Sequence, residues 1–236
     1  PIPIADLETL KNPMAEKILP RLSEEEMQTY IETELTEASK VLPANYKKGD
    51  KNYGRFTAGL AHTVLLKLYM LTKQWDKAEA EGRELMKPEY GFELVPEYKD
   101  IFTLANEKNP EIIWACQCAK GYQEHKWQPH VLPNDYNFTS YLDKMTKWNG
   151  YKISWDFMQT FDPADRRLLT IAYEYTSKDG VVHNEKNDRP DPSAQLYLGA
   201  VPLKYEFDPD CTGEDSQTDW IIYRYADVLT LTAEAI

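Results

Sequence analysis

Helical periodicity is strong over about the first 90 residues of this chain and then lapses until about residue 220. Apolar side chains recur at helical spacing from Met27 to Leu42, and again from Phe56 to Thr72, where the stripe predicts a helix of about 20 residues. Trp75-Asp76 opens a third helix, with Asp76 as a natural N-cap and Pro88 as its boundary. A chain that begins in this way folds around packed helices.

The second and third predicted helices form a tight hairpin. Its apolar, aromatic and small residues, among them Leu65, Tyr69 and Ala78, fall at offsets similar to those of a tetratricopeptide unit. The segment from Ser23 to Glu26 is a capping box for the first helix, because the hydroxyl and the carboxylate each accept a hydrogen bond from an unpaired N–H group. The hairpin pattern occurs once and does not repeat along the chain.

Short strands and loops are predicted between about residues 91 and 219. A helical turn is expected at Tyr98–Phe102, and Ser154 is expected to cap a short helix. Asp179-Gly180 before Val181–His183 is typical of a β-hairpin. Residues 120–150 have no clear period but are rich in aromatic side chains, which argues against disorder. Strands are predicted at residues 110–116, 168–175 and 201–207.

The last segment, Trp220 to Ile236, is predicted to be a helix with an apolar residue at every third or fourth position. It stops at Glu234-Ala235-Ile236 with no glycine, proline or polar cap. No later segment covers its apolar face, so we expect the chain to be truncated. The start, Pro1 to Ile4, has neither the basic region nor the apolar stretch of an export signal.

Composition narrows the classes of function. Hydrophobic residues make up 42% and charged residues 28% of the chain, so it is expected to bury a core. With 39 acidic and 27 basic residues, the net charge is −12, which disfavours binding to nucleic acid and a polybasic membrane anchor. No run of about 18 apolar residues occurs, and no membrane-spanning helix is predicted.

Metal, cofactor and nucleophile signatures are weak. Three cysteines are an odd number, and Cys116 and Cys118 supply too few ligands for a structural zinc site. The loop from Asp208 to Asp219 partly matches the calcium-loop template. Asp219 replaces the bidentate glutamate of that template and a strand is predicted before the loop, so the loop is only a weak calcium candidate. No metal or cofactor is predicted, and no phosphate loop or serine elbow is found. Positions 1, 3, 5, 6 and 12 of that template are occupied by Asp208, Asp210, Thr212, Gly213 and Asp219.

Several sequence blocks follow one another in a recognisable order. The most specific runs from Arg224 to Leu229 and ends with Ala233-Glu234-Ala235, and the block from Phe161 to Arg167 supports it. In this order the blocks span nearly the whole chain, and the series resembles the SusD/RagB family of surface lipoproteins of Gram-negative, glycan-utilising bacteria. The remaining blocks are Tyr53–Thr57, Trp75–Ala78, Tyr98–Phe102, Asn109–Trp114, Leu203–Tyr205 and Trp220–Tyr223.

The resemblance implies a mostly α fold that is built on tetratricopeptide-like helical pairs, with an inserted loop- and strand-containing region. It implies a single SusD-like domain fragment over residues 1–236, with a helical part at 1–90, the loop and strand region at 91–219, and the start of a further helix at 220–236. A full member of the family would also carry an N-terminal lipobox cysteine and the first helical pairs. Family ligand sites often draw residues from that N-terminal part.

For function, the resemblance implies binding without catalysis. Such proteins hold a nutrient, usually an oligosaccharide or polysaccharide, at the outer-membrane cell surface and deliver it to a SusC-type TonB-dependent transporter. We therefore expect carbohydrate binding, a SusC-like partner, no nucleic-acid partner, and a lipid anchor on the missing N-terminus. Some relatives are thought to take peptides, so a peptide cargo stays open.

Aromatic and amide side chains near residues 120–150 are the candidate binding site. Sugars present apolar C–H faces ringed by hydroxyls, so a flat ring gains burial free energy on the face while amides hydrogen-bond the rim. Gly150 allows the backbone to approach a ligand closely. The alternative is that the rings pin the loop to the core, which is the role expected of Trp75, Trp114, Trp155 and Trp220. The predicted ligand-binding residues are Tyr122, Trp127, Trp148, Asn149 and Tyr151.

Two other functions stay open. A tetratricopeptide-type scaffold would bind a peptide or protein, but it would repeat its helical units across the chain, and the pattern lapses after about residue 90. A glycoside hydrolase, the least favoured, needs two carboxylates across a sugar, and Asp162 and Asp165 are the nearest candidates. The resemblance instead implies a structural ion pair with Arg166 or Arg167. His125 and His130 are considered as hydrogen-bond donors to a ligand.

Overall fold

The chain divides into two compact units in the computed structural model, which describes residues 2–12, 14, 19–136, 144–210 and 213–236. Unit 1 comprises Pro1–Phe92 together with Tyr223–Ile236, and unit 2 comprises Glu93–Ile222. Each unit has its own interior, and each is described separately below. Among the described residues, no helix combines the length and the apolar character that crossing a membrane requires.

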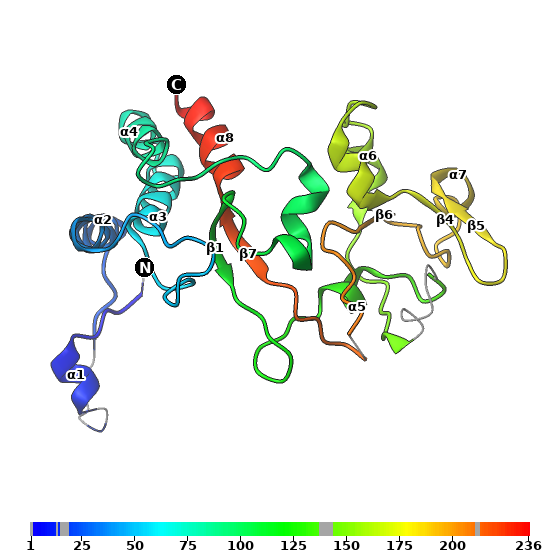
Figure 1. Cartoon of the computed structure of the whole chain (residues 1–236), viewed down its shortest axis with the longest axis horizontal. Coiled ribbons are helices and arrows are strands. Elements are labelled where there is room, and N and C mark those ends of the chain that lie inside the picture. The colour runs from blue at the N-terminus through cyan, green and yellow to red at the C-terminus, as the bar shows by residue number, and fades with distance from the viewer. Residues whose placement is uncertain (1, 13, 15–18, 137–143, 211–212) are drawn as a thin grey trace. The chain divides into compact units, whose positions relative to one another are not determined.

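Unit 1 is helical (Figure 1). Helix α3 packs against α2, α4 and α8, and α4 also packs against α8. The interior is mainly aliphatic, with Leu65, Leu66 and Leu85 almost completely buried. The Ser23–Glu26 capping box at the start of α2 is confirmed, with Ser23 Oγ accepting from the Glu26 N–H and Glu26 accepting from the Ser23 N–H. The helices of unit 1 are α1 (Leu7–Lys11), α2 (Glu24–Val41), α3 (Ala58–Leu71), α4 (Trp75–Leu85) and α8 (Tyr225–Ala235).

Two helix starts in unit 1 differ from the prediction. Helix α3 has 14 residues, because the Thr57 hydroxyl caps it by accepting from the Leu60 N–H at 3.1 Å. Phe56 therefore precedes the helix, and its side chain is 64% exposed instead of joining the apolar stripe. Helix α4 begins at Trp75 without a side-chain cap, so Asp76 lies in its first turn, where a carboxylate still favours the helix dipole.

Helices α4 and α8 cross at a glycine. A Cβ built on Gly82 would lie 2.8 Å from the Cβ of Thr232, closer than such atoms approach in proteins. Both residues are buried, and the Thr232 hydroxyl is turned back onto its own helix, donating to the Val228 carbonyl oxygen at 2.6 Å. The absence of a side chain at Gly82 is thus what lets the two helices come together.

Unit 2 is built from short strands, short helices and loops. Strand β6 lies between β2 and β3 in a three-stranded antiparallel sheet, β4 pairs with β5, and β1 pairs with β7. Its α-helices are α5 (Trp127–Val131), α6 (Trp155–Met158) and α7 (Glu185–Asp188), with 3-10 helices η1 (Tyr98–Phe102), η2 (Leu104–Asn106) and η4 (Arg166–Thr170). Its strands are β1 (Ile112–Cys116), β2 (Ile153–Ser154), β3 (Ile171–Ala172), β4 (Glu174–Thr176), β5 (Val182–Asn184) and β6 (Gly199–Pro202), and β7 (Trp220–Arg224) begins in unit 2, with its last two residues in unit 1.

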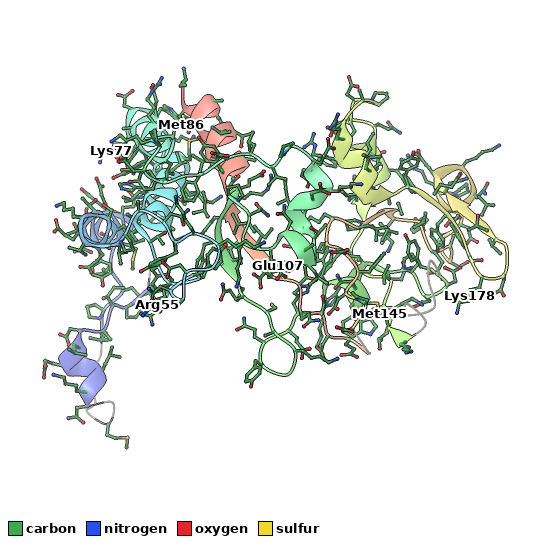
Figure 2. All side chains as sticks on the ribbon, in the orientation of Figure 1. Arg55, Lys77, Met86, Glu107, Met145 and Lys178 are labelled. Atoms are coloured by element: carbon green, nitrogen blue, oxygen red, sulfur yellow. The ribbon has the colours of Figure 1, made fainter. Side chains whose placement is uncertain are left out.

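Several predicted elements of unit 2 are confirmed. The turn at Tyr98–Phe102, the strand that ends at Cys116 and the short helix capped by Ser154 are all present. The Asp179-Gly180 turn joins β4 to β5, with Tyr175 opposite His183 in the register. Figure 2 labels Lys178 in this turn.

Three predicted elements of the chain are wrong in type or extent. The predicted helix from Trp220 begins instead as strand β7, because this segment pairs with β1, and the helix starts only at Tyr225. The predicted strand over 168–175 is broken into η4, β3 and β4, with a bend at Tyr173. The strand predicted over 201–207 is limited to Gly199–Pro202, where it pairs with both β2 and β3.

The core of unit 2 contains large rings as well as aliphatic side chains. Trp155 is 5% exposed, and its indole N–H donates to the Leu196 carbonyl oxygen at 2.9 Å. Tyr136 and Tyr175 meet edge to face, with their ring centroids 5.0 Å apart. A buried ring whose polar group is hydrogen-bonded, such as that of Trp155, fixes the loop that carries it. The core cluster is Val131, Leu132, Tyr136, Met145, Trp155, Tyr175, Leu196, Ala200 and Val201.

Candidate functional site

A cavity of about 600 Å³ lies in unit 2. Its wall is made by the end of β1, the loop that follows β1, helix α5, Tyr151 and strand β7. Segments about 100 residues apart in sequence are thereby brought around one space. The lining residues are Cys116, Cys118, Gln123, Glu124, His125, Lys126, Trp127, His130, Tyr151, Trp220 and Ile222.

Aromatic rings form the apolar part of the wall. The Trp127 ring lies nearly parallel to that of Tyr151, at 24° with centroids 6.2 Å apart, and is 5.5 Å from Trp220. Trp220 in turn stacks on Tyr205 at 5.2 Å and 14°. The ammonium of Lys204 lies 5.9 Å from the Trp127 ring centroid, within the range of a cation–π interaction. Each ring is held by other rings, so the wall is preformed.

His125 is held as a neutral imidazole. Its Nε2 lies 2.8 Å from the Thr218 carbonyl oxygen, which can only accept, so Nε2 carries the hydrogen. The Trp127 backbone N–H donates to Nδ1 at 3.2 Å, so Nδ1 supplies the lone pair. Burial lowers the pKa of His125, in agreement with this neutral form. The ring fixes the start of α5 and faces Trp220 at 5.1 Å.

Two carboxylates, one buried and one half-buried, hold the segments around the cavity together. Asp219, next to Trp220, accepts from the Cys118 N–H at 2.8 Å, and its own N–H donates to Glu107 at 2.8 Å. Burial raises the pKa of both the Asp219 and the Glu107 carboxyl groups. Figure 2 labels Glu107. The first bond fixes the loop after β1 against the start of β7, and the second fixes the segment before β1 against it.

The two cysteines of the wall are half-buried thiols. Cys116 Sγ accepts from the Gln123 side-chain amide at 2.7 Å, and Cys118 Sγ lies 3.6 Å from the Cys116 carbonyl oxygen. Burial raises the pKa of the Cys118 thiol, so the neutral thiol is favoured. Both are free of disulfides and serve as apolar wall atoms.

The structure places the five predicted ligand-binding residues differently. Trp127 and Tyr151 line the cavity, whereas the other three do not. Tyr122 is 94% exposed at the tip of the turn closed by Ala119 and Gln123. The Trp148 ring packs edge-on against His130, with centroids 4.7 Å apart. Tyr122 precedes the lining residue Gln123 in the sequence, and Trp148 packs on the lining residue His130, but neither ring is part of the wall.

Asn149 and Gly150 serve the fold rather than the cavity surface. Asn149 has a positive φ of 52°, its N–H donates to the Leu132 carbonyl and its side-chain amide donates to the Gln195 carbonyl at 3.1 Å. A Cβ at Gly150 would lie 2.7 Å from the His130 carbonyl oxygen. The close approach that glycine allows here is to the chain's own backbone, at the His130 carbonyl oxygen.

The tryptophans that were expected only to pack differ in burial and in whether they line the cavity. Trp155 is buried as expected, but Trp220 both packs on Tyr205 and lines the cavity. Trp75 is 41% exposed at the start of α4, so it packs only in part. Trp220 was missed as a site residue because its local pattern resembles the start of a helix, and only its pairing with β1 brings it to the cavity.

In the candidate calcium loop, the carboxylates of Asp208 and Asp219 accept hydrogen bonds from the chain itself. Asp208 accepts from the backbone N–H groups of Asp210 and Gln217, at 2.9 and 3.1 Å. Asp219 is turned toward Cys118 instead of toward Asp208. Thr212, at another position of the template, lies outside the described residues. Within the part of the chain that the structure describes, no three acidic, histidine or cysteine side chains are grouped so as to hold a metal ion.

The Asp165 region forms ion pairs, as the resemblance implies. Arg167 binds the Asp165 carboxylate with two of its nitrogens, and Arg166 pairs with Glu97. The Arg167 guanidinium holds the pKa of Asp165 below its usual range. Asp162 accepts from the Ala164 N–H at 2.8 Å with its carboxylate and from the Asp165 N–H at 2.9 Å with its carbonyl oxygen, so it closes the turn that leads to Asp165.

Comparison with known proteins gives structural neighbours only. No family model and no curated protein matches the chain. A SusD superfamily protein from Parabacteroides distasonis is 18% identical with a TM-score of 0.72, over 99% of this chain and 50% of the neighbour. Surface glycan-binding protein A from Bacteroides uniformis is 22% identical with a TM-score of 0.68, over 94% and 47%.

A further neighbour carries a ligand. Surface glycan-binding protein A from Bacteroides thetaiotaomicron, in complex with laminarihexaose, is 16% identical with a TM-score of 0.62, over 89% of this chain and 49% of that protein. The chain thus spans about half the length of the solved structures that it matches. At these identities the likeness concerns the fold, and it agrees with the series of sequence blocks described above. The chain therefore has a SusD-like fold.

Proposed function

We propose that the 600 Å³ cavity of unit 2 binds a glycan without catalysis. The observation that carries this proposal is the wall itself, in which the rings of Trp127, Tyr151 and Trp220 stand beside hydrogen-bonding side chains such as Gln123 and His130. A sugar's C–H face against such a ring removes apolar area from water at about 25 cal/mol per Å². The polar neighbours then bind the hydroxyl rim.

The structural neighbours support the glycan class. Two of them are surface glycan-binding proteins, and one was solved with laminarihexaose. The net charge of −12 suits a neutral sugar better than a polyanionic one. The proposal for this chain extends to neutral oligosaccharides and polysaccharides as a class.

The absence of catalysis is proposed from the chemistry of the lining. Hydrolysis of a glycosidic bond needs two carboxyl groups about 5–9.5 Å apart across the sugar. Glu124 is the only carboxylate among the described residues that line this cavity. With a single carboxylate, the wall is suited to holding a sugar and not to cleaving it.

The wider role is also a proposal. We propose that the protein belongs to the SusD/RagB group, is held by a lipid anchor at the outer-membrane surface, and passes its glycan to a SusC-like TonB-dependent transporter. The order of the sequence blocks and the SusD-like fold support this role. The α3–α4 hairpin, with Ala78 buried where the helices meet, supports a tetratricopeptide-like pairing.

The binding site is tested by calorimetry with a glycan identified on a glycan array. Tyr151→Ala and Trp127→Ala each remove one ring of the wall, and we expect each to weaken binding by about 2 kcal/mol, or about thirtyfold in Kd. Tyr197→Ala and Trp75→Ala are matched controls, because these half-exposed rings do not line the cavity. Both controls are expected to bind as the unmodified protein does.

Three results would contradict the proposal. Unchanged affinity in both Tyr151→Ala and Trp127→Ala would show that the cavity is not the site. Shorter sugars found by chromatography after long incubation would show that the protein is a hydrolase. Binding of peptides with no binding of any glycan on the array would favour the scaffold function.

A further inference from the structure

A second cavity, of about 390 Å³, lies elsewhere in unit 2. Helix α6 forms one side of it, and the β4–β5 hairpin with the start of α7 forms the other. It shares no lining residue with the first cavity. Its lining residues are Trp155, Met158, Gln159, Tyr173, Glu174, Asn184, Glu185 and Lys186.

The hairpin side of this cavity is anchored by buried bonds. His183 Nδ1 lies 2.8 Å from the Asp188 carboxylate, which also accepts from the Leu196 N–H at 2.9 Å, and both His183 and Asp188 are buried. Tyr175 stacks on the His183 ring at 4.8 Å and donates to Asp135 at 2.6 Å. The strands and helix that carry the lining residues are therefore fixed to the core of unit 2.

The two sides are also joined across their rim. The Arg189 guanidinium pairs with Asp156 of α6 at 2.7 Å and with Glu185 of α7 at 2.6 Å. Exposed ion pairs of this kind add little stability individually, but the shared guanidinium links α6 to α7, which lie on the two sides of the cavity.

Tyr173 supplies an open ring at this cavity. It lies at the bend between β3 and β4, and it is 53% exposed, whereas Tyr175 two residues later is buried. None of the ring contacts among the described residues includes Tyr173. A large flat side chain that faces a cavity without another ring on it is suited to bind the apolar face of a ligand.

The charges of the lining favour a neutral, hydroxyl-rich ligand. One oxygen of Glu174 accepts from the Asn184 amide at 2.9 Å and one oxygen of Glu185 accepts from Arg189. Each carboxylate keeps further acceptor capacity for a hydroxyl donor. An anionic ligand would be opposed by the two carboxylates of the lining, and Lys186 beside them reduces the attraction for a cationic one. Hydroxyls can use all three groups without a charge of their own.

We infer that this cavity is a second glycan subsite, with Tyr173 as its platform. The inference rests on the proposed function of the first cavity and deepens it, since two subsites on one unit suit a long polysaccharide rather than a short oligosaccharide. Once one subsite holds a chain, the other meets it at a high effective concentration. The apparent affinity for a polymer then exceeds that of either subsite alone.

Native gel electrophoresis in gels that contain one soluble neutral polysaccharide each, such as laminarin, glycogen, xylan or galactomannan, tests this inference. Migration of the protein is compared with that of Tyr173→Ala, Tyr173→Phe and the control Tyr197→Ala. With the polysaccharide that retards the protein most, Tyr173→Ala is expected to lower the affinity about tenfold. Tyr173→Phe keeps the ring and is expected to keep most of the retardation, and Tyr197→Ala all of it.

The outcomes separate the two proposals. If Tyr173→Ala is retarded like the unmodified protein while Tyr151→Ala is not, the second subsite is wrong and the first stands. If Tyr173→Phe loses as much as Tyr173→Ala, the ring is not the platform and the inference also fails. If no polysaccharide retards the unmodified protein, the proposed function is wrong and the subsite with it.

Discussion

The two units of this chain are stabilised by different means. In unit 1, helices bury aliphatic stripes against each other, and their backbone bonds are closed within each helix. In unit 2, strands of two to five residues leave many backbone groups to be satisfied by side chains. Asn109 donates to the Ile101 carbonyl oxygen, and the Gln128 amide donates to that of Glu206.

The two cavities described above are built from segments of unit 2. Irregular segments held by rings and buried polar groups can present side chains at angles that a helix face does not offer. Trp127 and Trp220 each have two roles, because each packs against other rings of the fold and also lines the first cavity. Unit 1 has rings of similar size, such as Trp75, but no described cavity lining includes one of them.

The largest expected effect contrasts one tryptophan from each unit. Trp155→Ala removes a 5% exposed ring and the hydrogen bond to Leu196, so we expect a loss of about 3–5 kcal/mol in the free energy of unfolding. Trp75→Ala removes a 41% exposed ring, and we expect a loss below about 1 kcal/mol. Urea unfolding measures both. Equal losses would show that burial does not decide what each of these two rings contributes to stability.

A smaller effect is expected at the helix crossing of unit 1. Gly82→Ala places a Cβ against Thr232, and we expect about 1–3 kcal/mol of destabilisation from overpacking. Thr232→Ala in the same protein removes the hydroxyl and methyl groups that clash, and should restore part of the loss. Far-UV circular dichroism during urea unfolding follows the helices. If the single and double variants unfold alike, the crossing is not limited by this contact.

Local signals were enough where the element depends on its own residues. The Ser23–Glu26 box, the Ser154 cap and the Asp179-Gly180 turn all act within a few residues, and each is present in the structure. Strand β7 could not be predicted in this way. Its residues carry a helical period, but pairing with β1, more than 100 residues earlier, decides its conformation.

The residues of the candidate site also divide into those with a local sequence signal and those placed by long-range pairing. Trp127 and Tyr151 were found because aromatic side chains in a segment without period stand out locally. Trp220 gives no such signal, since it joins the wall only after a distant strand has paired. Tyr122 and Trp148 gave the same local signal as Trp127, yet neither lines the cavity. Composition identified the region, and long-range pairing selected the residues.

The smallest expected effect concerns pH and the polar ties of unit 2. Burial lowers the pKa of His125 below its ordinary value of 6.5, so the unfolded chain takes up a proton at this residue at a higher pH than the folded chain. Stability from His125 is therefore present above about pH 6.5 and is lost as the pH falls below it. In unit 1, His62 differs from His125, because its Nδ1 lies 2.6 Å from the Glu81 carboxylate and not beside a backbone group.

The geometry gives the same sign for binding. Protonation of His125 would place a hydrogen on Nδ1, directly against the Trp127 N–H that now donates to it, and would loosen the start of α5 at the cavity wall. We expect both the unfolding midpoint in urea and the glycan affinity to fall between pH 7 and pH 5 in the unmodified protein. His125→Gln keeps an amide donor near the Thr218 carbonyl oxygen but does not titrate, so it should flatten both profiles. Parallel profiles for the two proteins would show that protonation of His125 controls neither the stability of unit 2 nor the affinity of the cavity.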